Sequence, residues 1–390
     1  MADVDLLSPQ DWTFPIPIAY GPGRLKEITR HCQQAGMQRP LIVTDSGSAN
    51  LPFVIRTEQL LRDAGLHTVI YSTISPNPRD DEIAAGRAQF LADKHDGIVA
   101  IGGGSGMDGG KAICLTANND LDLWQFDTER ESPALEAQSF PPLITIPSTA
   151  GTGAETESTG MITDTKRGMK LCIWHPLCKP AVALLDPEIT VGLPANLTAW
   201  TGCDAMIHAI EAYCVPGFHP LCDGAALEGL RLIYQWLPAA VVDGSDLEAR
   251  GAMLVGSCLA GIAFLKGLGV VHAISHMVGA EYDTHHGLTN SIVLPAALRF
   301  NRDAMIDKLP AMAAAMRLDS DDFDSFYAAL CGRLDELDIP KNLTDIGVPA
   351  ECGSEMAERA YLDSATATNI CPLSVADIQA IVDESLNQGR

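Results

Sequence analysis

The chain lacks the features that mark several classes of protein. Basic residues are few: 26 Lys and Arg stand against 50 Asp and Glu, which gives a formal net charge of −24. A surface this acidic repels the phosphates of nucleic acids and anionic membranes, so we expect neither as a partner. Solubility explains the acidity more simply than a specific cationic ligand does.

Disulfide and export signals are also missing. The 11 cysteines include no CxxC pair and their number is odd, which favours reduced thiols over a disulfide scaffold. Residues 1–5 lack the basic start and apolar core of a signal peptide. We therefore expect a cytoplasmic protein.

No uninterrupted run of the chain is long enough to span a membrane, although 47% of the residues are hydrophobic. Residues 253–271 come closest, but Lys266 and several glycines interrupt the apolar run. A spanning helix needs about 20 consecutive apolar residues. The segment is better explained as a buried helix of a large helical domain.

The pattern that is present changes character near the middle of the chain. In the first half, short β-branched runs alternate with helical stretches at residues 57–64 and 80–93. The expected strands are residues 41–44, 67–71, 97–101, 143–146 and 181–185. Such alternation is typical of a parallel sheet covered on both faces. From about Thr198 the pattern is almost wholly helical, with clear examples at residues 204–213, 247–264 and 375–386.

We therefore predict two domains, which also suits a length of 390 residues. The first is an α/β Rossmann-like dinucleotide-binding domain over residues 1–190, and the second is an all-α domain over residues 191–390. The cleft between two such domains is the default place for a ligand.

A glycine-rich turn follows the third expected strand, from Gly102 to Gly110. Glycines between a strand and a helix let backbone N–H groups approach a phosphate, and the helix dipole adds attraction. Gly104, Gly106 and Gly109 match GxGxxG, but the match is weak in so glycine-dense a run. The turn is not a Walker A loop, because Ala112 follows Lys111. A tight turn that binds no ligand would show the same cluster of glycines.

Two other strand ends favour a dinucleotide. Asp45 ends the first expected strand, where a carboxylate could bind the ribose of NAD and repel the extra phosphate of NADP; a helix N-cap is the structural alternative. The segment from Ser148 to Gly153 follows a later strand and offers hydroxyls and amides for a pyrophosphate. All three features are expected at one edge of the sheet.

Histidines are scarce, yet they cluster in the second half. Of the 10 in the chain, four lie between His272 and His286. Asp204 and His208, four residues apart on an expected helix, share one face. A carboxylate with several imidazoles suits a divalent first-row metal, and spacing does not choose between Fe(II) and Zn(II). Without thiolates, such a site is more typical of a catalytic than of a structural metal.

These motifs together resemble the iron-containing (group III) alcohol dehydrogenase family over nearly the whole chain. The segments that carry the resemblance are residues 14–25 with Tyr20-Gly21-Pro22-Gly23, Gly102 to Ser105 with Asp108 and Lys111, Pro147 to Gly153, Thr201-Gly202-x-Asp204-Ala205 with His208 to Glu211, His272-x3-His276, and His286-Gly287. The resemblance implies the dehydroquinate synthase-like architecture of that family and usually a homodimer or a larger oligomer.

The resemblance also implies a division of roles. The implied metal ligands are Asp204, His208, His272 and His286. His276 would lie near the nicotinamide and the substrate, where it could relay a proton. The implied NAD contacts are Asp45, Asn77, Gly104, Ser105, Ser148, Thr149, Thr152 and Lys170. Iron before zinc as the metal rests on the resemblance alone.

Three positions depart from the family pattern. His285 stands where many relatives have proline; a solvent-facing loop histidine is the simpler interpretation, and a second-shell or substrate contact the other. Glu157 replaces a threonine that many relatives have near the cofactor, so no contact is transferred there. Residues 368–372 lack the arginine that many relatives carry in that loop.

The expected reaction is hydride transfer between a small-molecule alcohol and NAD, with the alcohol oxygen on the metal. A maleylacetate reductase-like enzyme, which works without metal, is disfavoured by the complete Asp/His set. A dehydroquinate synthase-like lyase would need several Lys or Arg near the metal, and residues 272–290 contain none. A zinc polyol dehydrogenase resembling glycerol dehydrogenase stays open. A non-catalytic binding module would not need both a dinucleotide site and a metal site.

Overall fold

The computed structural model describes residues 16–387 and 389–390, which divide into two compact units. The α/β unit consists of residues 16–149 and 153–192, and the helical unit of residues 150–152 and 193–390. The chain thus changes unit between Gly192 and Leu193, and the short segment 150–152 packs with the helical unit although the α/β unit flanks it in sequence. Phe14, the predicted start of the opening strand, and residues 1–5 lie outside the described residues.

The described part of the α/β unit contains a six-stranded sheet in which every pair of neighbours is parallel. Its strands in spatial order are β1 (Ile18–Tyr20), β8 (Val182–Leu185), β5 (Leu143–Pro147), β4 (Gly97–Gly102), β2 (Pro40–Asp45) and β3 (Val69–Ile74). All five predicted strands lie in this sheet. β3 begins at Val69, two residues later than predicted, because the backbone of His67 bonds to Gln38 before the ladder starts.

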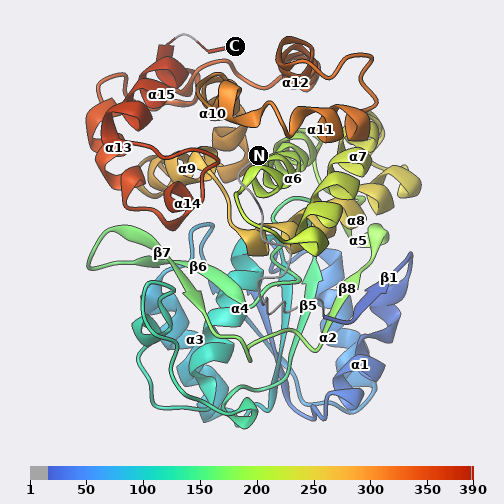
Figure 1. Ribbon diagram of the computed structural model, residues 1–390. Coiled ribbons are helices and arrows are strands. Elements are labelled where there is room, and N and C mark those ends of the chain that lie inside the picture. The colour runs from blue at the N-terminus through green and yellow to red at the C-terminus, as the bar shows by residue number, and fades with distance from the viewer. Residues whose placement is uncertain (1–15, 388) are drawn as a thin grey trace. The chain divides into compact units, whose positions relative to one another are not determined.

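Helices cover both faces of the sheet (Figure 1). They are η1 (Arg24–Glu27), α1 (Ile28–Gln34), α2 (Pro52–Asp63), α3 (Asp80–Ala92), α4 (Gly104–Ala117), η2 (Leu123–Phe126), η3 (Ala137–Ser139) and α5 (Pro187–Thr190). Successive residues of β2 point to opposite faces. Leu41 and Val43 belong to the apolar cluster with α3 and α4, whereas Ile42 belongs to the cluster with α1 and α2. Both faces are therefore buried, as in other parallel sheets.

The order of the strands creates a switch point between β2 and β4. After β2 the chain moves to β3 on one side, and after β4 it moves to β5 on the other. In open α/β sheets, ligands bind outside the carboxyl ends of the strands at such a point. Asp45 ends β2, and the glycine-rich turn begins at Gly102, the last residue of β4.

An antiparallel hairpin of β6 (Thr159–Asp164) and β7 (Met169–Trp174) was not predicted. Its turn has a local cause: Asp164 Oδ1 accepts from the amides of Lys166 and Arg167, at 2.9 and 3.0 Å, and Gly168 has φ of 64°. Residues of β6 alternate between half-buried and buried. This period of two is the signal that sequence reasoning overlooked.

The described part of the helical unit contains helices throughout, as predicted. They are α6 (Ala195–Cys214), α7 (Pro220–Val242), α8 (Leu247–Ala263), η4 (Phe264–Lys266), α9 (Val270–Tyr282), α10 (His286–Asn301), η5 (Arg302–Met305), α11 (Leu309–Met316), α12 (Phe323–Glu336), η6 (Leu343–Ile346), α13 (Gly353–Tyr361), α14 (Ser364–Ala367) and α15 (Val375–Asn387). Aspartates cap several starts; Asp246, for example, accepts from the amides of Glu248 and Ala249.

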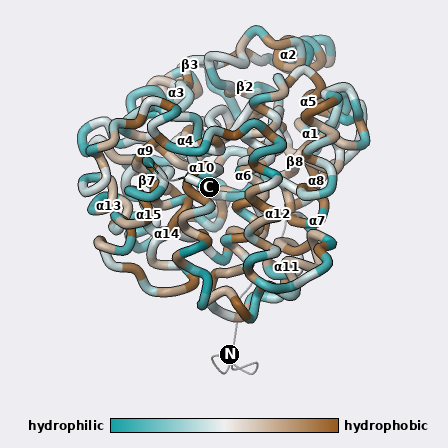
Figure 2. Tube along the Cα trace, turned by 90° about the horizontal axis from the view of Figure 1, so that it is seen from above, coloured by the Kyte–Doolittle hydropathy of each residue, from teal (hydrophilic) through white to brown (hydrophobic). Residues whose placement is uncertain are grey.

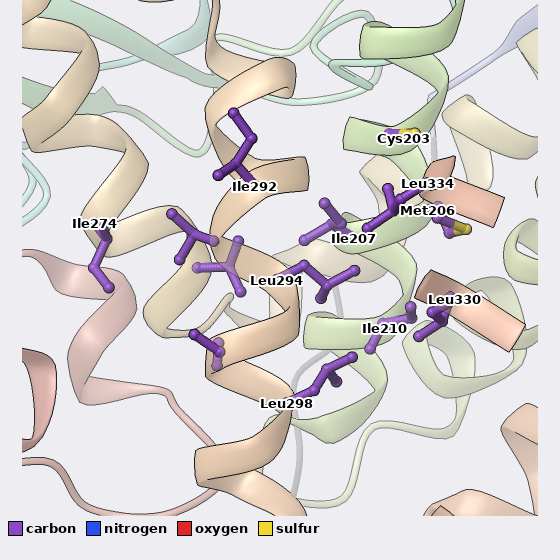
Figure 3. Close-up of a cluster of buried hydrophobic side chains, with 14 of the residues drawn as sticks. Cys203, Met206, Ile207, Ile210, Ile274, Ile292, Leu294, Leu298, Leu330 and Leu334 are labelled. Carbon is purple, nitrogen blue, oxygen red and sulfur yellow. The ribbon is translucent and has the colours of Figure 1, made fainter. Parts of the chain in front are cut away.

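One large apolar core holds these helices together. Figure 3 shows Ile207 and Ile210 of α6 near Leu294 and Leu298 of α10, all within this buried cluster. Apolar and polar residues follow one another along the trace (Figure 2), and the buried apolar residues of these helices form the core. α6, α9 and α10, which carry the predicted metal ligands, therefore rest on a rigid apolar base.

Within the described residues, one helical stretch, Leu247–Lys266, is long and apolar enough to cross a membrane by length and composition. However, 67% of its apolar window is buried inside the structure, and Met253, Leu254 and Ala260 belong to the apolar core. This burial is typical of a core helix and agrees with the prediction for this segment.

Candidate metal centre and cofactor-binding edge

The four predicted metal ligands come together in the helical unit. One potential ligand atom from each of Asp204, His208, His272 and His286 lies within 4.8 Å of the other three. Asp204 Oδ1 is 3.6 Å from His272 Nε2, 3.6 Å from His286 Nε2 and 3.9 Å from His208 Nε2.

Three helices supply these side chains. Asp204 and His208 lie one turn apart on α6, so their side chains share a face. His272 lies near the start of α9, and His286 is the first residue of α10. Gly287 permits the close approach of α10 to α6, because a Cβ at this position would lie 2.3 Å from the carbonyl oxygen of Trp200. A side chain there would push His286 away from the other ligands.

Each imidazole is held from behind through its Nδ1 atom. Nδ1 of His272 lies 2.6 Å from Glu211 Oε2, and Nδ1 of His208 lies 3.3 Å from the carbonyl oxygen of Gly151. Both partners only accept hydrogen bonds, so in the neutral form of each ring Nδ1 carries the proton and Nε2 keeps the lone pair that a metal would bind. Nδ1 of His286 lies 3.0 Å from Ser275 Oγ. Such partners fix the orientation of metal-binding histidines.

Glu211 does more than orient His272. Its Oε2 also accepts from the amide of Gly269 at 3.0 Å, and its Oε1 accepts from the amide of Val271 at 2.9 Å. These amides belong to the start of α9, where backbone N–H groups lack partners within the helix. One buried carboxylate therefore fixes both the ring of His272 and the start of the helix that carries it.

The amide of Asn290 shows that the centre has an excess of acceptors. Its Nδ2 atom lies 2.7 Å from Asp204 Oδ1 and 3.1 Å from the Nε2 atoms of both His272 and His286. When both rings are neutral, as metal binding requires, an amide nitrogen with two hydrogens cannot satisfy these three acceptors. Asn290 Oδ1 is itself buried without a hydrogen-bond partner among the described residues. A convergent carboxylate and imidazole set of this kind fits a cation.

The electrostatics of the centre also favour a cation. Burial alone would raise the pKa of Asp204, but His208, His286 and His272 hold it well below its ordinary value. Burial lowers the pKa of His272, but its hydrogen bonds to Asp204 and Glu211 outweigh this effect and raise the pKa to about 9. Burial, with a smaller contribution from His272, lowers the pKa of His208 to about 4. The carboxylates of Asp204 and Glu211 thus give the centre a negative electrostatic potential, which attracts a cation.

The set is enclosed on three sides. The side chains of Asp204, His208 and His272 are at most 5% exposed, whereas that of His286 is 31% exposed. An accessible side suits a catalytic metal, which keeps one position open for substrate.

His276 lies next to the set without belonging to it. Its ring stacks on that of His286 with centroids 5.4 Å apart and planes 10° apart. Its Nδ1 lies 2.9 Å from Asp363 Oδ2. Asp363 is a partner that sequence reasoning did not identify.

His285 is not a solvent-facing loop residue, so the simpler interpretation of its position was wrong. It is the N-cap of α10, and its Nδ1 accepts from the amide of Leu288 at 3.4 Å. Its ring lies against Trp200 with centroids 5.0 Å apart. Burial lowers its pKa, against a smaller opposite effect of Asp204. The histidine therefore starts the helix that carries His286.

Seven of the eight predicted cofactor residues lie in the α/β unit, and the eighth, Thr152, belongs to the helical unit. α4 begins at Gly104, directly after β4, so its N-terminal amides are available to a phosphate. Gly106 allows α4 to lie close to β2: a Cβ there would be 3.1 Å from the carbonyl oxygen of Ile101 and 3.2 Å from the amide of Asp45. The glycines therefore have a steric purpose in the contact between helix and sheet.

Asp45 and the strand-end hydroxyls flank this turn. Asp45 Oδ1 accepts from the amide of Ser48 at 2.9 Å, which fixes the carboxylate at the end of β2. The amide of Ser148 donates to the carbonyl oxygen of Gly102 at 2.8 Å and joins the end of β5 to the turn. Thr149 Oγ1 is buried without a hydrogen-bond partner among the described residues. A ligand that accepts or donates a hydrogen bond would fit beside it.

Residues distant in sequence complete the edge. Lys170 Nζ on β7 donates to Asn77 Oδ1 at 3.3 Å, across 93 residues. Ser105 Oγ donates to the carbonyl oxygen of Pro76 at 2.5 Å and ties the same loop to α4. Thr152 lies in the segment that packs with the helical unit.

A buried ion pair fastens the hairpin to α4. Asp108 Oδ1 lies 3.2 Å from Lys111 Nζ, and Asp108 Oδ2 accepts from the amide of Met161 at 3.1 Å. Lys111, only 1% exposed, also donates to the carbonyl oxygen of Thr159. This anchor keeps β7, and with it Lys170, beside the turn.

Two buried carboxyls lie in the loop between β5 and β6. Burial raises the pKa of both Glu155 and Glu157 to about 7, and Lys111 opposes the shift in both. Glu157, the departure from the family pattern, is thus a buried carboxyl that gains and loses its proton near neutral pH rather than an exposed charge.

Comparison with known proteins extends these observations to the whole chain. The family model described as iron-containing alcohol dehydrogenase matches residues 15–187, and the model for the C-terminal part of the Fe-containing alcohol dehydrogenase family matches residues 198–386. An NAD-dependent methanol dehydrogenase from Bacillus methanolicus is 36% identical over 375 residues, which cover 94% of this chain and 97% of the relative. A 1,3-propanediol dehydrogenase from Klebsiella pneumoniae is 35% identical over 372 residues, covering 92% and 94%.

The fold agrees with these matches. A solved structure of a 1,3-propanediol oxidoreductase has a TM-score of 0.92 and 34% sequence identity, and the comparison covers 96% of this chain and 99% of that one. Fold and sequence thus define a dehydrogenase with an α/β and a helical part. The chain belongs to the iron-containing alcohol dehydrogenase family. It is an oxidoreductase that acts on the CH–OH group of small-molecule alcohols, with NAD and a metal as its cofactors.

This result confirms the predicted family, fold class and reaction class. The maleylacetate reductase-like and dehydroquinate synthase-like alternatives are not favoured.

Proposed function

We propose that Asp204, His208, His272 and His286 hold the catalytic metal, with Fe(II) preferred to Zn(II). The observation that carries this proposal is the convergence of one carboxylate and three imidazoles on one acceptor-rich point. The family description, which names iron, supports the choice of metal. When bound there, a divalent metal supplies a Lewis acid that lowers the pKa of an alcohol hydroxyl.

The protein groups prepare this chemistry. Glu211, Ser275 and the carbonyl of Gly151 hold the Nδ1 sides of the rings, so that the Nε2 atoms face the shared point. Asp204 lowers the net charge of the loaded site and helps to retain the metal. The partly exposed side at His286 leaves room for the oxygen of a substrate.

We propose His276 as the residue that accepts the hydroxyl proton and passes it outward. It lies beside His286, and Asp363 holds its Nδ1 side, so its Nε2 atom is the one that can take up a proton. NAD, when bound, would supply the two-electron acceptor for the hydride of the alcohol carbon.

We propose that NAD binds at the edge formed by the turn after β4. The start of α4 at Gly104 and Ser105 suits the pyrophosphate, together with Ser148, Thr149 and Thr152. Lys170 and Asn77, joined by a hydrogen bond, offer further polar contacts. Asp45 suits the ribose of NAD and would repel the 2′-phosphate of NADP.

We propose short primary alcohols and the corresponding aldehydes as substrates. Two relatives are named for methanol and for 1,3-propanediol, which supports this choice. The family resemblance further suggests a homodimer or larger oligomer, and the composition suggests a cytoplasmic location.

The test is a substrate panel on protein stripped of metal and reconstituted separately with Fe(II) under anaerobic conditions and with Zn(II). Methanol, ethanol, 1,3-propanediol and glycerol are assayed with NAD and NADP, and the aldehydes with NADH. We expect NAD-linked turnover of the short alcohols that needs added metal and is faster with Fe(II). Full turnover without metal would overturn the metal assignment, and activity only with NADP would contradict the role of Asp45. A preference for glycerol with Zn(II) would favour the polyol dehydrogenase alternative.

A further inference from the structure

The structure pairs His276 with a carboxylate that sequence reasoning did not place there. Asp363 Oδ2 lies 2.9 Å from His276 Nδ1, and the side chains are 6% and 11% exposed. The pair joins α9 to the start of α14, across 87 residues. A buried contact of this length and separation is a specific feature of the fold, unlike the exposed ion pairs of the surface.

The position of Asp363 is fixed independently of His276. Asp363 is the N-cap of α14, and its Oδ1 accepts from the amide of Ala365 at 2.9 Å. Its own backbone amide donates to the carbonyl of Ala360 at 3.1 Å, which ties it to the end of α13. One oxygen of the carboxylate therefore holds the helix, and the other is left for the imidazole.

An ion pair also holds α9 against α13. Arg359 donates to Glu281 at 2.9 Å, and the two residues come from α13 and α9. The helix that carries His276 and the segment that carries Asp363 are thus joined at a second point.

The chemistry of the contact decides which ring nitrogen carries the proton. An ionised carboxylate only accepts hydrogen bonds, so a neutral His276 bonded to it must carry its hydrogen on Nδ1. Its Nε2 then has a free lone pair. A histidine that takes up a proton at Nε2 needs this tautomer, and the opposite tautomer would block the step.

We propose that Asp363 is a positioning residue that fixes the Nδ1–H tautomer and the ring orientation of His276, so that Nε2 accepts the hydroxyl proton of the alcohol. This inference rests on the proposed function of His276. Asp363 acts through His276 and touches neither the metal ligands nor the cofactor residues in any contact described above.

Two substitutions separate this role from a structural one. In Asp363→Asn, the amide oxygen can still cap α14, while the amide nitrogen faces Nδ1 and donates to it, which forces the hydrogen onto Nε2. In Asp363→Ser, the hydroxyl still caps the helix but does not reach the ring, so both tautomers are available. A structural role would leave the isosteric Asn variant close to the unmodified enzyme.

The experiment measures kcat, KM, metal content, NADH affinity and thermal stability of the metal-loaded full-length enzyme. We expect Asp363→Asn to lower kcat by about 100- to 10,000-fold and to leave metal content, NADH affinity and melting temperature unchanged. Asp363→Ser should lose less activity than Asp363→Asn. The matched control is Asp322→Asn, which changes an exposed N-cap on α12 and should leave kcat unchanged. Near-normal kcat in Asp363→Asn would overturn the proposal.

A spectroscopic measurement tests the tautomer without turnover. In protein labelled with ¹⁵N-histidine, the signals of His276 are identified from a His276→Gln variant. We expect a hydrogen on Nδ1 in the unmodified protein and on Nε2 in Asp363→Asn. A hydrogen on Nε2 in the unmodified protein would refute the proposal. If the tautomer is as expected but the metal-loaded enzyme oxidises no alcohol, the function proposed for His276 fails while the positioning by Asp363 stands.

Discussion

The proposed cofactor edge of the α/β unit and the proposed metal centre of the helical unit are built from different parts of the protein. The edge consists largely of backbone: the amides at the start of α4, the turn at Gly102, and short loops where parallel strands end. The centre consists of side chains from three helices, each with a dedicated partner behind it. An edge made of backbone follows from local sequence and topology, whereas a centre made of side chains depends on packing over long distances.

This difference implies that the two sites can be damaged separately. Variants of the helical unit should change metal content and leave the affinity for NADH intact. Variants of the α/β unit should do the opposite. Three predictions test this separation, and a fourth concerns the stability of the α/β unit.

The largest effect is expected for His272→Ala, which removes one ligand and the group that Glu211 holds. Loss of an outer partner alone typically costs about 10- to 100-fold in metal affinity or activity, so loss of the ligand should cost more than about 100-fold in turnover. Metal content by mass spectrometry should fall, while NADH fluorescence titration gives an unchanged affinity. The exposed His67→Ala is the control. Full activity of metal-free His272→Ala would refute the metal assignment.

Glu211→Gln should weaken metal retention without abolishing it. The neutral amide no longer offers a charged acceptor to Nδ1 of His272, and we expect metal affinity to fall by about 10- to 100-fold. Competition with a chromogenic chelator measures this affinity. Glu228→Gln on α7, which changes an exposed glutamate paired with Arg231, is the matched control. Equal metal affinities of the two variants would contradict the role given to Glu211.

Asp108→Ala should damage the other unit. It leaves the amine of Lys111 buried without its carboxylate, and breaking a buried pair in this way costs about 3 kcal/mol or more of the unfolding free energy. The hairpin that carries Lys170 should loosen, so the NADH affinity should fall while the metal content stays the same. The double variant Asp108→Ala/Lys111→Met should recover part of the stability in thermal melts. A loss of metal in Asp108→Ala would break the separation of the two sites.

The smallest effect is expected for Glu157→Gln and depends on pH. Because the pKa of Glu157 is about 7 in the folded protein against an ordinary 4.5, the folded state binds more protons than the unfolded state between these pH values. Stability must therefore fall as the pH rises from 4.5 to 7. The shift corresponds to about 3 kcal/mol. Denaturant titrations should show Glu157→Gln gaining stability over the unmodified protein at pH 8 and not at pH 5; an equal difference at both would contradict it.

The parallel sheet of the α/β unit could be predicted from the sequence, but the residue pairs that hold the edge of this sheet together could not. The alternation of strands and helices predicts the parallel sheet because both faces of such a sheet are buried and its strands are rich in β-branched residues. The hairpin of β6 and β7 was missed, and with it the reason why Lys170 meets Asn77. That contact depends on the ion pair of Asp108 and Lys111, and the spacing of these two residues on α4 does not reveal that they bind the backbone of β6.

In the helical unit, the residues that could bind a metal were visible, and the residues that orient them were not. Asp204 and His208 are recognisable because a helix places residues four apart on one face. Glu211 follows on the same helix, but its bond to His272 depends on the packing of α6 against the start of α9. Asp363 looks like an ordinary N-cap in sequence. His285 was misjudged because a capping histidine and a loop histidine share the same local pattern.

The carboxylate of Glu211 has a consequence for how this enzyme can be observed. The amides of Gly269 and Val271 donate to the side chain that also holds His272. Their rates of hydrogen exchange therefore respond to whatever disturbs that ring. Hydrogen exchange at these two backbone positions, followed by mass spectrometry on the purified protein, should therefore report whether the proposed metal site is loaded, without any substrate.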